Sequence, residues 1–285
     1  MLFLGKIFCM KLTLGFSTCP NDTFIFDALI HKKVNTEGLE FDVILADIEE
    51  LNRNAFEGKT DITKLSYHAF AYIANDYKLL TSGSALGYKN GPLLIGKRKI
   101  YPDEVADLKV AIPGKYTTAN LLFSIVYPSV KEKREYLFSD IEEAILDGEV
   151  DAGVIIHENR FTFEKKGLKK IIDLGEDWEE KTNNPIPLGG IVIRRKFEPE
   201  IQQKVNRVLK RSVEFALANP NSSYRFVKNY AKELNDEVIQ KHIDLYVNNF
   251  TVDLGEMGKN AVRTLFDKAE KEKIIEKVQQ DIFVD

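Results

Sequence analysis

Short apolar runs alternate with stretches of helical periodicity through the first two thirds of the chain. The runs that read as strands are residues 11–16, 39–45, 60–66, 108–112 and 152–156, and the helical stretches are residues 23–31, 48–56, 67–75, 117–125 and 139–147. Such alternation is typical of α/β proteins. We therefore expect a mainly parallel sheet whose ligands bind at the carboxyl ends of its strands.

Beyond residue 195 the apolar positions follow helical spacing almost throughout, at residues 201–217, 224–234, 238–246 and 261–271. Two strand-like segments, residues 92–96 and 190–194, bracket a middle block that repeats the strand and helix alternation. We therefore predict a large discontinuous lobe, residues 1–96 with 190–285, and a smaller inserted α/β lobe, residues 97–189. The helical third should pack on the first lobe, and a ligand cleft should lie between the lobes, where hinge closure buries a ligand.

Composition is that of an ordinary globular protein, with 285 residues, 44% hydrophobic and 29% charged. The chain carries 40 Lys plus Arg against 44 Asp plus Glu, a net charge of −4, and no basic run dense enough to follow a phosphate backbone. These features argue against a nucleic-acid partner and favour a small-molecule one. The oligomeric state is left open, with a homodimer among the options.

Two cysteines, Cys9 and Cys19, do not make a disulfide framework, and no Cys or His cluster has the spacing of a metal site. The apolar opening MLFLGKIFCM is broken by Gly5 and Lys6, is followed by no small-residue cleavage site of an export signal, and is too short to span a membrane. We therefore expect a cytoplasmic protein with no membrane partner. Because Met10 directly precedes the first strand, residues 1–9 read as an upstream start-site extension.

Polar turns follow the predicted strands and lead into helices or loops. In the first, FSTCPNDTF, Asn21 and Asp22 precede or open a helix, where one of them caps its N–H groups, and the turn can also hold an anionic or hydroxylated ligand. In the second, Lys64 and Ser66 stand between a strand and a helix. Ser66 has the residue type of an N-cap, and Lys64 is placed to meet a carboxylate.

The third turn, PGKYTTANLLF, places Thr117 and Thr118 at a helix start after Gly114. Either threonine is a helix cap, and the same groups favour a carboxylate or phosphate, because the N-terminus of a helix carries partial positive charge. The glycine spacing of a nucleotide-binding P-loop is absent.

The fourth turn, DAGVIIHENRF, places His157 at a strand exit, where an imidazole titrating near neutral pH suits a general base. A lone histidine is more often structural, so this role stays one of two alternatives on composition alone. We expect His68 to lie on a helix surface or in the core, and His31 and His242 to be solvated.

Six segments together resemble a known family: FSTCPNDTFIFDALIHKKVNTEGLEF, TKLSYHAFAYI, GPLLIG, GKYTTAN, DAGVIIHENRFTF and PLGGIVIRR. They resemble the 1,4-dihydroxy-6-naphthoate synthases, enzymes of the futalosine route to menaquinone. The resemblance covers most of residues 11–195 and extends more weakly into the helical third. It implies a two-lobed α/β fold of the type II periplasmic-binding-protein kind, which the sister enzyme chorismate dehydratase shares.

The resemblance also implies an activity, the conversion of cyclic dehypoxanthine futalosine to 1,4-dihydroxy-6-naphthoate and dihydroxyacetone. The family's proton acceptor falls on His157. Its substrate contacts fall on Lys64, Leu65, Ser66, Thr117, Thr118 and Ala119. The substrate is then a small anionic molecule, its ring walled by Leu65, Tyr67 or Tyr116, and the carbon–carbon cleavage calls for no cofactor.

Three other readings stay open. A solute-binding protein of the same fold needs the cleft but no catalytic base. A chorismate dehydratase uses a related cleft to eliminate water. A regulatory effector-binding domain is disfavoured, because no helix-turn-helix segment accompanies the two lobes.

Overall fold

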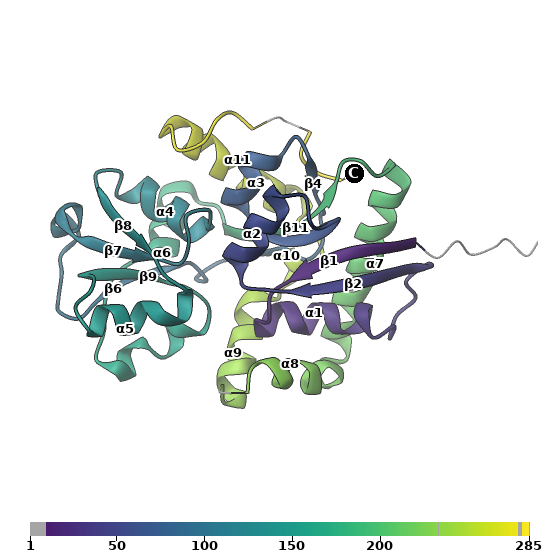
Figure 1. Ribbon diagram of the computed structural model, residues 1–285, viewed down its shortest axis with the longest axis horizontal. Coiled ribbons are helices and arrows are strands. Elements are labelled where there is room, and N and C mark those ends of the chain that lie inside the picture. The colour runs from purple at the N-terminus through teal and green to yellow at the C-terminus, as the bar shows by residue number, and fades with distance from the viewer. Residues whose placement is uncertain (1–9, 233, 279–280, 285) are drawn as a thin grey trace, which may run out of the picture.

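Two separate β-sheets form the centres of two lobes that lie side by side (Figure 1). The computed structural model describes residues 10–232, 234–278 and 281–284, so the start-site expectation for residues 1–9 lies outside the described residues. The first sheet has the order β2-β1-β3-β11-β4, with β5 paired to β11. Its strands are β1 (Met10–Phe16), β2 (Leu39–Leu45), β3 (Ile62–Ser66), β4 (Tyr77–Leu79), β5 (Ala85–Gly87) and β11 (Ile186–Arg194).

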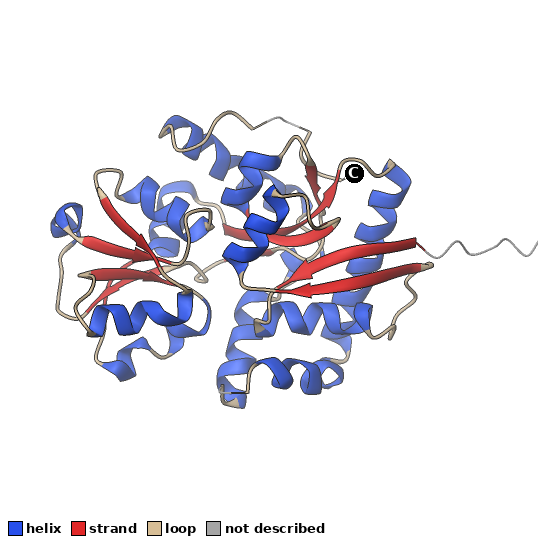
Figure 2. Cartoon of the chain, viewed as in Figure 1, coloured by secondary structure: helices blue, strands red, loops and turns tan. Residues whose placement is uncertain are grey.

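The second sheet has the order β10-β6-β9-β7-β8. Its strands are β6 (Leu93–Gly96), β7 (Lys109–Ile112), β8 (Glu132–Glu135), β9 (Ala152–Ile155) and β10 (Lys169–Asp173). The helices of the first two thirds are α1 (Pro20–Ile30), α2 (Ile48–Phe56), α3 (Tyr67–Ile73), α4 (Thr118–Val126), α5 (Ile141–Leu146) and α6 (Leu174–Thr182). Figure 2 shows helices against both sheets, as the alternating pattern predicts.

Both sheets are mixed, which corrects the expectation of a mainly parallel sheet. β1 pairs in parallel with β2 and β3, and β7 with β8 and β9, but β11 and β6 run antiparallel to their neighbours. The reason is the route of the chain. β3 and β9 end at the boundary between the lobes, whereas β6 and β11 enter their lobes from that boundary and must run away from it.

The same two strands shift the predicted division of the chain. β6 lies in the second sheet and the whole of β11 in the first, so the crossings fall before residue 93 and before residue 186. The expected divisions at 96/97 and 189/190 are displaced by a few residues. The prediction took both strands as brackets of the inserted lobe. In the structure β6 is the first strand of the second sheet, and β11 is the strand by which the chain returns to the first sheet.

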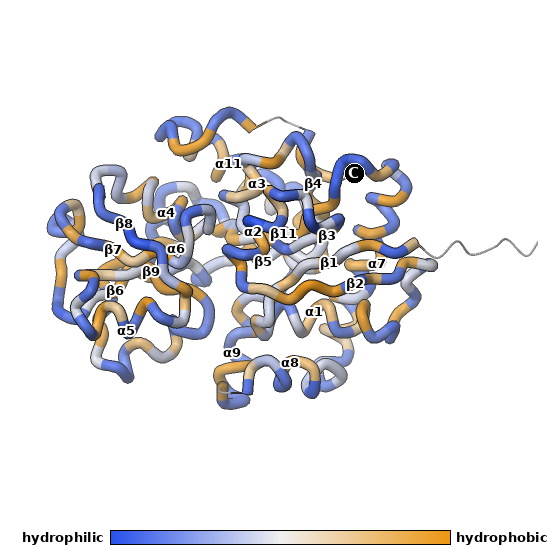
Figure 3. The backbone as a smooth tube through the Cα atoms, in the orientation of Figure 1, coloured by the Kyte–Doolittle hydropathy of each residue, from blue (hydrophilic) through white to orange (hydrophobic). Residues whose placement is uncertain are grey.

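The C-terminal helices pack on the first lobe, as expected. They are α7 (Pro199–Ala218), α8 (Tyr224–Tyr230), α9 (Asp236–Tyr246), α10 (Asn249–Val252) and α11 (Gly255–Lys271). Helices α7, α8 and α9 contact α1, and α11 contacts β11. In Figure 3 apolar and polar segments alternate along α7, α9 and α11, and the buried residues of these helices recur at helical spacing, so each has an apolar face to bury.

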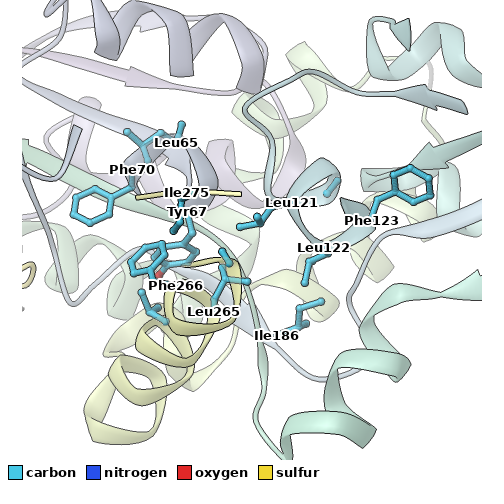
Figure 4. Close-up of a cluster of buried hydrophobic side chains, with 14 of the residues drawn as sticks. Leu65, Tyr67, Phe70, Leu121, Leu122, Phe123, Ile186, Leu265, Phe266 and Ile275 are labelled. Carbon is cyan, nitrogen blue, oxygen red and sulfur yellow. The ribbon is translucent and has the colours of Figure 1, made fainter. Parts of the chain in front are cut away.

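One apolar core continues from the first lobe into the second. Leu65, Tyr67 and Phe70 meet Leu265 and Phe266 of α11, and the same cluster includes Leu121 and Leu122 of α4 (Figure 4). A continuous core across the boundary holds the lobes in contact on one side and leaves the strand ends facing one another.

Candidate active site

A cavity of about 80 Å³ lies between the lobes, where the polar turns at the strand ends meet. It is lined by Ser17, Asn21, Asp22, Ile48, Lys64, Ser66, Ala85, Asn90, Pro92, Thr117, Thr118, Ala119, Ile156, His157, Leu188, Gly189 and Tyr246. The turns singled out in the sequence therefore come together at one place. This arrangement follows the rule that ligands bind at the carboxyl ends of strands.

The first lobe contributes a wall of polar side chains bonded to one another, centred on Asp22. Asp22 Oδ2 accepts hydrogen bonds from the Ser17 hydroxyl at 2.7 Å and from the Ser17 N–H at 3.3 Å. Asp22 Oδ1 accepts from Asn21 Nδ2 at 2.8 Å and from Lys64 Nζ at 3.0 Å. The carboxylate is thus fully occupied by neighbours of its own lobe.

Asn21 and Asp22 do not cap the helix, which corrects one reading of this turn. Helix α1 begins at Pro20 with Cys19 as its N-cap, which forms no side-chain cap hydrogen bond. Both residues lie inside the first helical turn. Proline at the first helical position needs no N–H partner, so the helix begins earlier than the sequence pattern indicated.

Lys64 does meet a carboxylate, but that carboxylate belongs to Asp22. The two side chains are 6% and 2% exposed, so the pair is buried. A buried ion pair of this kind is stable only when both partners are present, because either charge alone would be desolvated without compensation.

The Leu65 side chain faces the other way, so only the backbone of this residue is left as a possible substrate contact. Successive residues of a strand point to opposite faces, so Lys64 and Ser66 reach the cavity while Leu65 is fully buried in the core. Ser66 is the N-cap residue of α3 without a side-chain cap bond. Its hydroxyl oxygen accepts from Asn52 Nδ2 at 3.3 Å, so its own hydrogen remains available to donate.

Tyr67 and Tyr116 do not wall the cavity, contrary to expectation. The Tyr67 hydroxyl bonds to the Ser84 hydroxyl within the core, and Tyr116 packs edge-on against Phe56 at a centroid distance of 4.7 Å. The apolar lining comes instead from other residues: Ile156, directly before His157, and Ile48, Ala85, Pro92, Leu188 and Tyr246, which lie outside the four expected turns.

The second lobe presents the N-terminus of α4 to the cavity. Thr117 is its N-cap, with the hydroxyl oxygen accepting from the Asn120 N–H at 3.2 Å. The N–H groups of Thr118 and Ala119 have no acceptor within the helix, since the first turn of a helix offers none. The Thr118 hydroxyl donates to the Leu188 carbonyl of β11. Backbone groups, more than the Thr118 hydroxyl, are therefore open to an anion here.

His157 stands at the exit of β9 and lines the cavity, as expected. Its backbone has φ +58°, a left-handed conformation that few residues other than glycine adopt. Its ring lies edge-on to Phe138 and 6.0 Å from the ring of His242. Burial lowers the pKa of His157 below its ordinary value, so the imidazole is neutral and able to accept a proton at neutral pH.

Cys19 lies next to His157, with Sγ 3.6 Å from Nδ1. Burial raises the pKa of the Cys19 thiol, so the sulfur is uncharged. In the imidazole tautomer with hydrogen on Nδ1, that hydrogen points to the sulfur and Nε2 carries the free electron pair.

His242 corrects another expectation, since it is fully buried rather than solvated. Its Nε2 lies 2.9 Å from Asn21 Oδ1, and its Nδ1 lies 4.0 Å from the Glu158 carboxylate. Burial lowers the pKa of His242 well below the ordinary value, which keeps this second imidazole neutral. The signal was present in the sequence: His242 shares a helical face with Ile239, Ile243 and Tyr246 of α9.

The two remaining histidines are His68 and His31. His68 is buried at the contact between the lobes, where its Nδ1 lies 3.2 Å from the Thr117 carbonyl. His31 ends α1 and pairs with Asp27 at 2.9 Å, with about half of its side chain exposed. Neither lines the cavity.

Within residues 10–232, 234–278 and 281–284, no group of His, Cys, Asp and Glu side chains is arranged to hold a metal ion. Among the helices of that same part of the chain, none is long and apolar enough to cross a membrane.

Comparison with solved structures identifies the fold. The fold resembles the alkanesulfonate-binding protein of Xanthomonas axonopodis, with a TM-score of 0.70 over 96% of both chains at 13% identity. A crystal structure of an Archaeoglobus fulgidus protein is more similar, with a TM-score of 0.88 and 35% identity over 93% of this chain and 98% of that one. The molecule is therefore a two-lobed α/β protein of the periplasmic-binding-protein type, with its cavity between the lobes.

Sequence comparison identifies the family within this fold class. The family model described as menaquinone biosynthesis matches residues 12–271. The 1,4-dihydroxy-6-naphthoate synthase of Thermus thermophilus is 42% identical over 273 residues, which cover 96% of this chain and 99% of that protein. The chain belongs to the 1,4-dihydroxy-6-naphthoate synthase family of menaquinone biosynthesis.

Proposed function

We propose that this protein is a carbon–carbon lyase that converts cyclic dehypoxanthine futalosine to 1,4-dihydroxy-6-naphthoate and dihydroxyacetone. The observation that carries the proposal is the placement of a partly buried, neutral His157 in the same cavity as the open N-terminus of α4. The imidazole of His157 can accept a proton, and the N-terminus of α4 can bind a carboxylate. The near full-length similarity to a synthase of this name supports the same reaction.

The carboxylate of the substrate is assigned to the N-terminus of α4. The N–H groups of Thr118 and Ala119 are donors, and the helix dipole adds partial positive charge. Across the cavity, the Ser66 hydroxyl has a hydrogen to donate. The Lys64 ammonium has N–H donors beyond the one that Asp22 accepts. These groups hold an anion by local donors, so the net charge of −4 is no obstacle.

His157 is assigned the role of general base. It removes a proton from a hydroxyl of the substrate, the oxygen forms a carbonyl, and the adjacent carbon–carbon bond breaks in a retro-aldol-like step. The electron pair of that bond passes into the ring system, whose aromatisation drives the reaction, so the step needs no net oxidation or reduction. General-base assistance contributes a factor of about 10² to 10⁴ in rate.

The test is to supply the purified protein with cyclic dehypoxanthine futalosine and, separately, with chorismate. Formation of the naphthoate, followed by absorbance and confirmed by mass, is the expected result with the first substrate, and no reaction is expected with the second. Loss of water from chorismate would replace this proposal with a dehydratase. Binding of the first compound without any product would indicate a solute-binding protein of the same fold.

A further inference from the structure

Asn90 is a buried amide that lines the cavity and has no partner in the protein. It lies between β5 and β6, in the segment that crosses from the first lobe to the second, and is 1% exposed. Neither Nδ2 nor Oδ1 forms a hydrogen bond with any part of the chain that the structure describes. Buried polar groups are almost always paired, so an amide with both ends open requires an explanation.

The surroundings hold this crossing segment in place. A Cβ atom on Gly87 would lie 2.9 Å from Asn90 Nδ2, and one on Gly91 would lie 2.4 Å from the Gly175 backbone. Arg160 donates to the Gly91 carbonyl at 2.7 Å. The chain on both sides of Asn90 is therefore closely packed, which favours a fixed direction for its side chain.

Other buried polar atoms without partners lie elsewhere, which sets Asn90 apart. Among the described residues they belong to Glu49, Thr60, Tyr127, Glu142, Ser222 and His242, none of which lines this cavity. Among the described residues, Asn90 is therefore the one that combines an unpartnered buried polar group with a position in the wall of the proposed active site.

We propose that Asn90 binds the hydroxylated part of the substrate. This inference rests on the proposed function, and it adds a specificity-determining residue to that site. An amide offers N–H donors on one side and an acceptor oxygen on the other. A hydroxyl both donates and accepts, so neighbouring hydroxyl groups satisfy both ends of the amide. A carboxylate only accepts and would leave Oδ1 unpaired, whereas it fits the donors of α4. The cavity thus separates the two polar ends of the ligand.

The experiment compares Asn90→Leu with the wild type by steady-state kinetics, by titration calorimetry with cyclic dehypoxanthine futalosine and by thermal unfolding. Leucine has a similar size and removes the open amide. We expect KM and Kd to rise by about tenfold or more, because the ligand hydroxyls lose their partner. The unfolding midpoint should stay equal or rise, because no hydrogen bond within the protein is lost.

Asn206→Leu is the matched control. The Asn206 amide accepts from the Thr81 and Ser82 N–H groups and donates to the Thr81 hydroxyl, outside the cavity. This variant should unfold at a lower temperature with an unchanged KM. If Asn90→Leu behaves in the same way, Asn90 is a structural group and the inference is wrong.

Asn90→Asp tests which end of the ligand lies here. An aspartate still accepts hydrogen bonds from hydroxyls, so its affinity should fall between those of the wild type and Asn90→Leu. An affinity below that of Asn90→Leu would place the substrate carboxylate beside residue 90 and overturn the assignment. Calorimetry separates the two proposals. If the wild type binds cyclic dehypoxanthine futalosine without converting it, the proposed reaction is wrong but the role of Asn90 in binding is still testable. If the wild type neither binds nor converts it, both the proposed reaction and the role of Asn90 are wrong.

Discussion

The two walls of the cavity differ in how far their hydrogen-bonding groups are already used. On the first-lobe wall, Asp22 accepts from Ser17, Asn21 and Lys64, and Asn21 accepts from His242. On the opposite side, the first N–H groups of α4, the imidazole of His157 and the amide of Asn90 are open to the cavity.

This difference separates two kinds of polar residue at one site. The first wall is mainly a structural support whose side chains fix one another, with only the spare N–H donors of Lys64 and the Ser66 hydroxyl left for an anion. Its loss should therefore appear mainly as lost stability. The second wall and the crossing segment have bonding capacity left for a ligand, so substitutions there should alter binding or turnover more than folding. Variants on each side test this division.

Lys64→Met gives the largest expected effect on stability. Removing the ammonium leaves Asp22 buried with its charge uncompensated, so the free energy of unfolding should fall by about 3 to 5 kcal/mol. Urea unfolding measures the change. The double variant with Asp22→Asn should recover part of the loss, because neither charge then remains. A loss below about 1 kcal/mol for Lys64→Met would place this pair among the weak, solvated ion pairs.

His68 should make the contact between the lobes sensitive to acid. Burial lowers its pKa from 6.5 to about 4, so the unfolded chain binds a proton at a pH where the folded protein does not. The stabilisation is complete above pH 6.5 and decreases as the pH falls toward 4, by roughly 3 kcal/mol.

The measurement for His68 is urea unfolding of the wild type and His68→Gln across that pH range. The variant should lose less stability on acidification than the wild type does. His31→Gln is the control, since His31 is half exposed and lies outside the lobe contact. Parallel pH curves for wild type and His68→Gln would show that His68 does not carry the effect.

Thr118→Val gives the smallest expected effect. Because the Thr118 hydroxyl donates to the Leu188 carbonyl, its loss should loosen the start of α4 without removing a direct ligand contact. We expect KM to rise by about threefold to tenfold with little change in kcat, as for one neutral hydrogen bond. Thr118→Ser keeps the hydroxyl and should behave like the wild type. An unchanged KM in the valine variant would mean that the Thr118–Leu188 hydrogen bond does not help to position the α4 N-terminus for the anion.

Much of the site could be predicted because its parts are strand ends. Asp22, Lys64, Thr117 and His157 all stand within a few residues of a strand exit, and α/β folds gather such positions at one edge. Local sequence is enough to place each of them, since the strands themselves show as apolar runs.

The predictions from sequence fail where tertiary contacts determine the direction of a side chain or a strand. Leu65 lies between two cavity residues in sequence, but strand alternation points it into the core. His242 reaches the site from α9, far along the chain, and Asn90 lies in a crossing segment with no periodic pattern. The mixed sheets likewise follow from where β6 and β11 enter their lobes, which composition does not indicate.

The central claim is that His157 supplies the base while other groups hold the substrate. Its most direct test is His157→Gln, measured by calorimetry for Kd and by product formation for kcat with cyclic dehypoxanthine futalosine, beside His31→Gln as control. If His157 is the base, the variant should keep a Kd within about threefold of the wild type and have a kcat lower by about 10² to 10⁴. A His157→Gln enzyme that retains a kcat close to that of the wild type would contradict it.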